Sequence, residues 1–427
     1  MKKLAMNTLV AAVLATPLAA QDTTLNVWTW FPSEDIMGKV IAGFEAENPG
    51  VKINLNIFES TAYQDRMPLA LASGDALDVV AVQTSTMVEL VRGDLDALPP
   101  LFEEHASAPI GDLLSEAALG QAAALASDGE VYISPMGILG SAVVFYNGDM
   151  LAEMGLEIPR TRDDMAAFVA AVEAYNPDLL AYSFTGANWF LDEITLTIAE
   201  QGSPGFFNSV RYDQGGSWNS PEYAAAFDAI PAAYADGIFT VDTLDLDYGR
   251  AAELFQQGQA AAYIQGSWED GLLSAPHREA NSIPLDNVVA SGLPVMIEGG
   301  APAIRSYIDV AWAVPAQAQD AALSVKFIEY LTAGAGVGSW ADSLFVVPAA
   351  KGFDLPGGIF NSEAAEASYN EIAALLTAPT SDRNNVSDFS AAAGDAIISA
   401  IVSGKTTDEQ IEFLQSEWDS GRYSNAN

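Results

Sequence analysis

Residues 25–57 read LNVWTWFPSEDIMGKVIAGFEAENPGVKINLNI, and this stretch already indicates the class of fold. Residues 25–28 read as a short strand. From Val51 to Ile57 apolar and polar residues alternate, which predicts a strand with one buried face. The segment between them, 34–47, carries apolar residues at helical spacing, with Ser33 placed to cap the helix. The order is therefore strand, helix, strand.

The same alternation continues in both directions from this unit. A helix is predicted over 63–72 and a buried strand over 78–82, so the run is βαβαβ. Such a run argues for an α/β protein with a mostly parallel sheet covered by helices. Further strands are predicted in the rest of the chain at 143–146, 260–264 and 310–314, and further helices at 321–331, 389–401 and 411–418. Thr407 with Gln410 is a candidate capping box for the last helix.

The length of 427 residues suits two domains. The alternation of predicted strands and helices changes near residues 133–135, where one α/β unit ends and a second begins. A segment rich in Gly and Pro, 283–302, reads as a loose second crossing between the two units. We therefore expect the chain to pass between its domains near residues 133 and 293.

The first twenty residues have the layout of a secretory signal peptide. Lys2 and Lys3 precede the apolar stretch 9–15, and Ala19 and Ala20 offer a cleavage site. The apolar stretch is too short to span a bilayer as a permanent helix. We expect a soluble, exported protein that begins near Gln21, in a periplasm. The chain has no cysteine, which excludes disulfides, thiolate metal sites and a lipid-anchored cysteine.

The charge is strongly negative. The chain holds 57 acidic and 17 basic residues, and removal of residues 1–20 would leave 15 basic residues against the same 57. Such a surface repels nucleic acid and anionic membranes, so no nucleic-acid partner is expected. The acidic residues are dispersed, which favours a solvated surface suited to a saline setting.

Signatures of an enzyme or of a metal site are missing from the sequence. The two histidines, His105 and His277, are far apart, and residues 245–249 lack the spacing of a calcium loop. No serine lies in a Gly-x-Ser-x-Gly turn. With so many carboxylates, some pair suited to glycoside hydrolysis always exists, so their number is not diagnostic. We expect no cofactor, no metal and no catalytic residue.

The tryptophans carry more information. Trp30 lies at the end of the first strand, Trp189 in an irregular stretch, Trp268 after a strand and Gly266, and Trp340 in a Gly-rich loop. Ligands of α/β sheets collect at the carboxyl ends of strands. Indole faces stack on the C–H faces of sugar rings. These four residues are therefore candidates for binding a sugar, while Trp312 and Trp418 are predicted to be core residues.

Over nearly its whole mature length the chain resembles the family 1 extracellular solute-binding proteins of ABC importers. Leu77 stands where the family usually has Pro. The most specific piece is Leu254-Phe-Gln-Gln-Gly258, followed by Ala261-Ala262 and Gly266-Ser-Trp268. The other matching segments are 25–30, 44–51, 72–79, 129–135, 145–147, 311–331, 347–348 and the helix after Thr407.

The resemblance implies a type II periplasmic binding protein fold, with two hinge-connected lobes, each a helix-covered sheet. It adds a third crossing near residue 349. The expected N-terminal lobe comprises residues 21–133 and 298–348, and the C-terminal lobe residues 134–297 and 349–427. The ligand would lie between the lobes, which close by hinge bending, a transition for which this class of protein is a standard example.

By position, the resemblance also implies ligand contacts. Trp268 and Trp189 match stacking aromatic residues of the second lobe. The remaining candidates, apart from Trp30 and Trp340, are Glu59, Tyr63, Gln83, Thr84, Met136, Gly137, Asp270, Arg383 and Asn384.

The resemblance implies a monomeric, non-enzymatic binding subunit that delivers a mono- or oligosaccharide to the permease subunits of an ABC importer. Another polar solute, such as a polyol or glycerol-3-phosphate, is the alternative within the class. A phosphate ester would require several Arg or Lys residues, which this chain has in small number. A secreted glycoside hydrolase is the alternative from another class.

Overall fold

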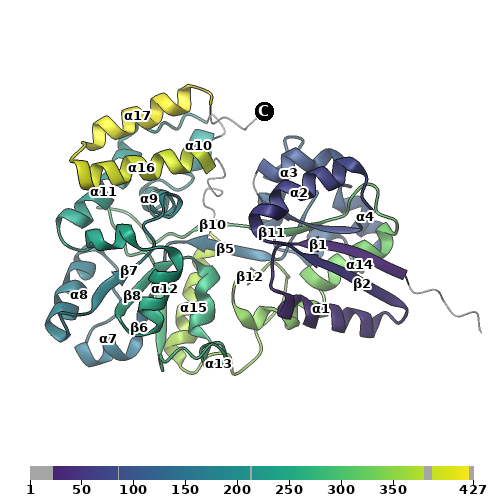
Figure 1. Ribbon diagram of the computed structural model, residues 1–427, viewed down its shortest axis with the longest axis horizontal. Helices are drawn as coiled ribbons and strands as arrows, with labels where there is room; N and C mark the ends of the chain where they lie inside the picture. The colour runs from purple at the N-terminus through teal and green to yellow at the C-terminus, as the bar shows by residue number, and fades with distance from the viewer. Residues whose placement is uncertain (1–22, 85, 212–213, 379–386, 423–427) are drawn as a thin grey trace, which may run out of the picture.

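The computed structural model describes residues 23–84, 86–211, 214–378 and 387–422. The predicted signal peptide, and the candidates Arg383 and Asn384, lie outside these residues. The described chain forms two lobes side by side, each with a sheet covered by helices (Figure 1). The predicted α/β class is confirmed.

The sheet of the first lobe is built on the strands at the two ends of the segment 23–57. β1 and β2 pair in parallel, with Leu25 opposite Ile53 and Val27 opposite Leu55. β11 enters antiparallel to β3 and separates it from β4. The order of the strands is β2 (Val51–Ile57), β1 (Thr23–Thr29), β3 (Val79–Gln83), β11 (Val310–Ala313) and β4 (Ser134–Pro135).

Helices on both faces bury this sheet. α1 places Met37, Val40 and Phe44 in the core, where Phe44 meets Phe327 of α14 edge-on, with 5.1 Å between ring centroids. Ser33 precedes α1 as predicted, but its side chain makes no capping hydrogen bond. The helices of this lobe are α1 (Glu34–Glu47), α2 (Ser60–Ser73), α3 (Thr86–Val91), η1 (Arg92–Asp94), α4 (Leu98–His105), α5 (Ile110–Leu113), α6 (Glu116–Ala124), α14 (Ala321–Thr332), η4 (Ala335–Ser339) and η5 (Ala341–Ser343).

The second lobe has a sheet in the order β7 (Leu180–Ser183), β8 (Ala260–Gln265), β6 (Val143–Asn147) and β9 (Val288–Gly292). β9 lies inside the segment 283–302, so the prediction of a loose crossing over that whole segment was wrong. The helices of this lobe are α7 (Gly148–Met154), α8 (Arg162–Tyr175), α9 (Asn188–Gly202), α10 (Phe206–Arg211), α11 (Pro221–Ala235), η2 (Val241–Asp245), α12 (Tyr248–Gln256), η3 (Ser267–Leu273), α13 (Ala275–Ala280), α15 (Glu363–Leu376), α16 (Ser387–Ser403) and α17 (Thr407–Asp419).

A narrow ribbon of strands runs between the two lobes (Figure 1). Its order is β10 (Arg305–Tyr307), β5 (Gly137–Ser141) and β12 (Val347–Pro348). In the described chain β5 and β10 each lie in a connection between the two sheets, and β12 lies in the segment that leads from η5 of the first lobe to α15 of the second. The lobe boundaries after residues 133, 297 and 348 lie in or beside these three segments and stay a prediction. Ser134–Pro135 nevertheless belongs to the first sheet, because it pairs with β11. We call β5 and β10 the hinge ribbon.

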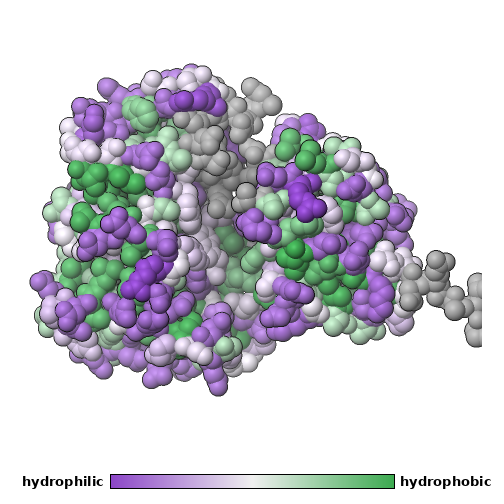
Figure 2. Space-filling view, in the orientation of Figure 1, coloured by the Kyte–Doolittle hydropathy of each residue, from purple (hydrophilic) through white to green (hydrophobic). Residues whose placement is uncertain are grey.

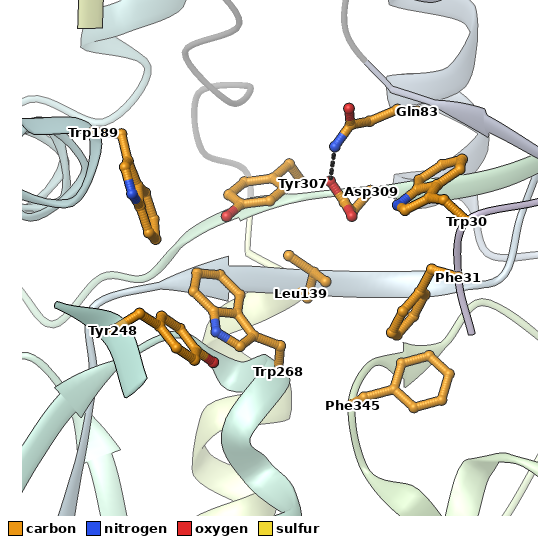
Figure 3. Close-up of a pocket in the computed structure, with 10 residues that line it drawn as sticks. All are labelled: Trp30, Phe31, Gln83, Leu139, Trp189, Tyr248, Trp268, Tyr307, Asp309 and Phe345. Atoms are coloured by element: carbon orange, nitrogen blue, oxygen red, sulfur yellow. Dashed lines mark hydrogen bonds between the residues drawn. The ribbon is translucent and has the colours of Figure 1, made fainter. Parts of the chain in front are cut away.

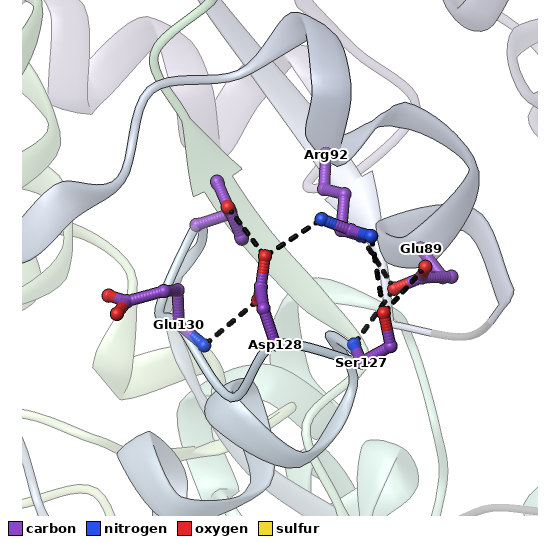
Figure 4. A network of polar contacts seen from close by, with 6 residues as sticks. Glu89, Arg92, Ser127, Asp128 and Glu130 are labelled. Atoms are coloured by element: carbon purple, nitrogen blue, oxygen red, sulfur yellow. Dashed lines mark hydrogen bonds and ion pairs between the residues drawn. The ribbon is translucent and has the colours of Figure 1, made fainter.

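A polar network holds the segment that leads into this ribbon (Figure 4). Arg92 donates to Glu89 at 2.8 Å and to Asp128 at 2.7 Å. The backbone N–H of Ser127 donates to Glu89 at 2.9 Å, and that of Glu130 to Asp128 at 3.1 Å. The turn before β4 is thereby tied to α3 and η1.

Candidate functional site

A pocket of about 460 Å³ lies between the lobes, within the range of about 300–1,000 Å³ usual for small-molecule sites. The space-filling view shows a hollow at this junction, with apolar surface inside it (Figure 2). Seven of the ten described lining residues are aromatic. The lining residues are Trp30, Phe31, Gln83, Leu139, Trp189, Tyr248, Trp268, Tyr307, Asp309 and Phe345 (Figure 3).

The first lobe supplies one wall from the ends of its strands. Trp30 and Phe31 follow β1, and Gln83 ends β3. The Phe31 ring meets Phe345 edge-on, with 4.8 Å between centroids. Trp30 packs on the ring of Tyr63 at 5.2 Å. This wall is therefore a set of aromatic faces fixed by other aromatic rings behind them.

The second lobe supplies the opposite wall. Trp189 begins α9 and Trp268 lies in η3, with 6.4 Å between their ring centroids and 42° between their planes. Tyr248 begins α12, and its hydroxyl donates a hydrogen bond to the carboxylate of Glu269. Burial raises the pKa of Glu269, although the bond from Tyr248 lowers it in part. Two indoles at an angle offer stacking surfaces to a ring that presents C–H groups.

The hinge ribbon and its continuation form the floor (Figure 3). Leu139 and Tyr307 are partners in the antiparallel pairing of β5 with β10. Asp309 follows β10 and accepts a hydrogen bond from Gln83 at 3.5 Å. Asp309 is the one residue with a charged side chain among the described lining residues. The pocket therefore joins many apolar faces to a few polar groups, the pattern common to ligand-binding sites.

Four of the predicted site residues meet in this pocket: Trp30, Gln83, Trp189 and Trp268. Six further lining residues were not predicted from the sequence: Phe31, Leu139, Tyr248, Tyr307, Asp309 and Phe345. Tyr248 lies in a stretch that reads as an acidic turn. Tyr307 and Asp309 precede the strand predicted over 310–314, and no strand was predicted immediately before them. No motif in the sequence distinguishes these residues.

Three polar or aromatic candidates support the structure of the first lobe instead of lining the described pocket. The Glu59 carboxylate accepts a hydrogen bond from the backbone N–H of Ala62 and so caps α2. Tyr63 is fully buried, with its hydroxyl 2.6 Å from the carbonyl oxygen of Ala81. Thr84 is buried and donates to the carbonyl of Ile308.

The other candidates within the described residues are buried outside the pocket lining. Met136 and Gly137 lie where the chain enters the hinge ribbon, and a Cβ on Gly137 would come 2.3 Å from the carbonyl oxygen of Val347. Asp270 is 1 % exposed, and burial, followed by the charge of Glu269, holds its pKa well above the usual range. Trp340 is a core residue, because its Nε1–H donates to the carbonyl of Leu331 and its ring packs behind Phe345.

The comparisons with known proteins agree with this architecture. The sequence model of the family "Bacterial extracellular solute-binding protein" matches residues 32–337. An uncharacterized ABC transporter extracellular-binding protein of Pyrococcus horikoshii is 22 % identical over 290 residues. That alignment covers 64 % of this chain and 65 % of the relative, so the chain spans slightly less than two thirds of the relative's length.

Solved structures with the same fold cover almost the whole chain. A chitin oligosaccharide binding protein is 18 % identical, with a TM-score of 0.74 over 95 % of this chain and 100 % of its own. An ABC substrate-binding protein of Listeria monocytogenes, in complex with cycloalternan, is 16 % identical, with a TM-score of 0.73 over 93 % and 98 %. The sugar-binding protein MalE of Xanthomonas citri is 18 % identical, with a TM-score of 0.72 over 93 % and 97 %.

Proposed function

The chain belongs to the bacterial extracellular solute-binding proteins, and on that premise we propose that it captures a saccharide between its lobes and delivers it to the permease subunits of an ABC importer. The observation that carries this proposal is the pocket lined by aromatic faces from both lobes. A sugar ring held there would stack on the indoles, and its hydroxyl groups would donate hydrogen bonds to Asp309 and Gln83. The structural neighbours whose names state a saccharide ligand support the same class.

The lining also bears on the alternatives. A phosphorylated solute is recognised by Arg or Lys, and neither type occurs among the described lining residues. A glycoside hydrolase needs a carboxyl group on each side of the scissile bond, whereas the described lining offers the single carboxylate of Asp309. Both observations favour a binding protein for an uncharged sugar, without catalytic activity.

The test is a thermal-shift screen against mono- and oligosaccharides, including chito- and malto-oligosaccharides and cycloalternan. A ligand that binds the native state raises the melting temperature. Hits are then measured by calorimetry, and the recovered sugar is assayed for new reducing ends. Binding with intact sugar is the expected result. A panel without any shift, or release of reducing ends, would refute the proposed function.

We further propose that the protein acts as a monomer in a periplasm, after cleavage of residues 1–20 near Gln21. The family is extracellular, and no helix in the described part of the chain could cross a bilayer. Mass spectrometry of the periplasmic fraction should detect a chain that starts at or near Gln21. A cytosolic protein that retains Met1 would contradict this proposal.

A further inference from the structure

A buried ion pair joins the hinge ribbon to the helix that carries Trp189. Arg305 of β10 binds the carboxylate of Glu193 of α9, and their side chains are 0 % and 3 % exposed. The guanidinium also lies over the ring of Phe207, 5.7 Å from its centroid. Two charges taken out of water are retained only when each closely satisfies the other. This pair therefore fixes the position of the ribbon on the second lobe.

The pair lies on the same face of the ribbon as the pocket. In the antiparallel register Arg305 is opposite Ser141, and Tyr307 is opposite Leu139. Side chains two residues apart on a strand share a face, so one face of the ribbon carries two pocket residues and two residues directed at α9. On that helix, Trp189 and Glu193 are four residues apart and also share a face.

Hydrogen bonds connect the ion pair to the pocket. Ser141 Oγ lies 2.8 Å from Glu193 Oε2 and 3.0 Å from the Tyr307 hydroxyl oxygen. A serine hydroxyl has one proton, and an ionised carboxylate only accepts. Ser141 therefore donates to Glu193, and Tyr307 donates to Ser141. With its proton directed inward, Tyr307 acts toward the pocket as a hydrogen-bond acceptor.

We propose that Glu193, Arg305 and Ser141 are positioning residues that orient the hydroxyl of Tyr307 to accept a hydrogen bond from a hydroxyl group of the ligand, and that hold it in register with Trp189. This inference rests on the proposed function, because it assigns the ligand a donor group at Tyr307. The backbone of the ribbon is held to the same lobe, since the N–H of Gly140 donates to Ser267 Oγ at 2.9 Å, next to Trp268. The floor of the pocket and its second-lobe wall are thus one unit.

The test uses the full chain and the saccharide with the largest thermal shift in the screen. Tyr307→Phe and Ser141→Ala should each weaken binding about three- to tenfold, the value of one hydrogen bond. If Ser141 acts through Tyr307, adding Ser141→Ala to Tyr307→Phe should change the Kd by less than about twofold. An additive effect in the double variant would overturn the inference.

Ser390→Ala is the matched control. Ser390 Oγ donates to the carboxylate of Asp192 at 2.8 Å, and both residues are buried. Asp192 lies on α9, as Glu193 does, but Ser390 lies on α16 and not on the hinge ribbon. This variant should lower the urea midpoint as Ser141→Ala does and leave the Kd unchanged. Equal effects of the two variants on the Kd would mean that Ser141 is merely structural.

Glu193→Gln tests the ion pair itself. It preserves size but removes the carboxylate charge that Arg305 binds, so it should lower the melting temperature and, where the protein folds, weaken binding. A folded variant with the wild-type Kd would refute the role of the pair. If the Glu193 variant does not fold, the comparison of the single and double variants of Tyr307 and Ser141 still tests the inference. Absence of saccharide binding by the wild type would instead refute the proposed function.

Discussion

Trp268 owes its orientation to the glycine two residues before it. A Cβ on Gly266 would lie 2.1 Å from Cζ3 of the indole, so the ring rests directly on the backbone of that residue. Its neighbour on the same wall of the pocket is Trp189. With one region of the ring packed on the backbone, the indole is held in place before any ligand arrives, which reduces the entropy lost on binding.

Replacement of Trp268 by alanine should weaken saccharide binding about ten- to a hundredfold, since burial of a large aromatic side chain contributes about 1.5–3 kcal/mol. The fold should be retained, because the residue is only partly buried at a pocket wall. Calorimetry measures the affinity and circular dichroism the fold. Trp312→Ala is the control: Trp312 is fully buried, and its loss should cost about 3–5 kcal/mol of unfolding free energy. An unchanged affinity of the Trp268 variant would remove this residue from the site.

The tryptophans also show how far the sequence leads at this scale. Trp189 and Trp268 were predicted because each follows a break in regular structure. Trp340 met the same criterion, but its Gly-rich loop folds into η4 and η5, which bury the ring. Tyr307 and Asp309 were not predicted as site residues, because β11 runs antiparallel to β3. In an antiparallel strand the residues before it, and not those after it, reach the edge where ligands bind.

At the scale of elements, the cap of α17 corrects the predicted pairing by one residue. The box is formed by Thr406 and Glu409, with bonds in both directions, and not by Thr407 and Gln410. Gln410 is instead a buried residue of α17 itself, and Thr407 donates to Asp228. Thr406→Ala should lower the unfolding free energy by about 1 kcal/mol. Thr407→Ala, measured in the same urea titrations, should have a smaller effect; the reverse order would restore the predicted box.

The 3-10 helix η3 places two adjacent carboxyl groups, Glu269 and Asp270, where burial raises the pKa of both. The folded protein therefore binds protons more tightly than the unfolded chain at these sites. Their contribution to stability is fully present below the unfolded pKa values and is lost as the pH rises through the folded pKa values. Asp270→Asn should increase the urea midpoint at pH 8 and reduce the gain in stability on going from pH 8 to pH 5.

Asp128 provides the control of opposite sign. Its hydrogen bonds, first that from the backbone N–H of Glu130, hold its pKa below the usual range. Its contribution is present above the unfolded pKa and is lost as the pH falls through the folded pKa, in the acid range. Asp128→Asn should leave the slope between pH 8 and pH 5 unchanged. Equal slopes for the wild type and Asp270→Asn would show that Asp270 does not titrate with a raised pKa.

Strands and helices with regular periodicity were predictable, because their pattern depends on the burial of one face. The run from β1 to β3 is found at its predicted positions within a few residues. β9 was missed because Val288–Gly292 is short, buried throughout without an alternating pattern, and surrounded by glycine and proline. Its strand conformation comes from pairing with β6, an interaction distant in sequence.

For the molecule as a whole, charge is the dominant feature. A formal net charge of −40 opposes a compact state. Raising KCl from about 20 mM to about 500 mM reduces the Debye length well below 10 Å, so the urea midpoint at pH 7 should increase. The increase should shrink as the pH approaches the isoelectric point of about 4.1, where the net charge vanishes. A midpoint that is independent of salt at pH 7 would show that repulsion between carboxylates does not limit stability.

The position of β11 also determines the order in which the protein can fold. This strand separates β3 from β4 although it follows both, and Gln83 and Asp309, which meet across the sheet, are 226 residues apart. A ribosome releases β1, β2 and β3 long before the strand that closes their sheet. Native pairing over such separations is slow to form, so the first lobe can be completed only after all four strands of the second-lobe sheet have been synthesised. The sheet of the first lobe therefore lacks its fourth strand until residues 310–313 have left the ribosome.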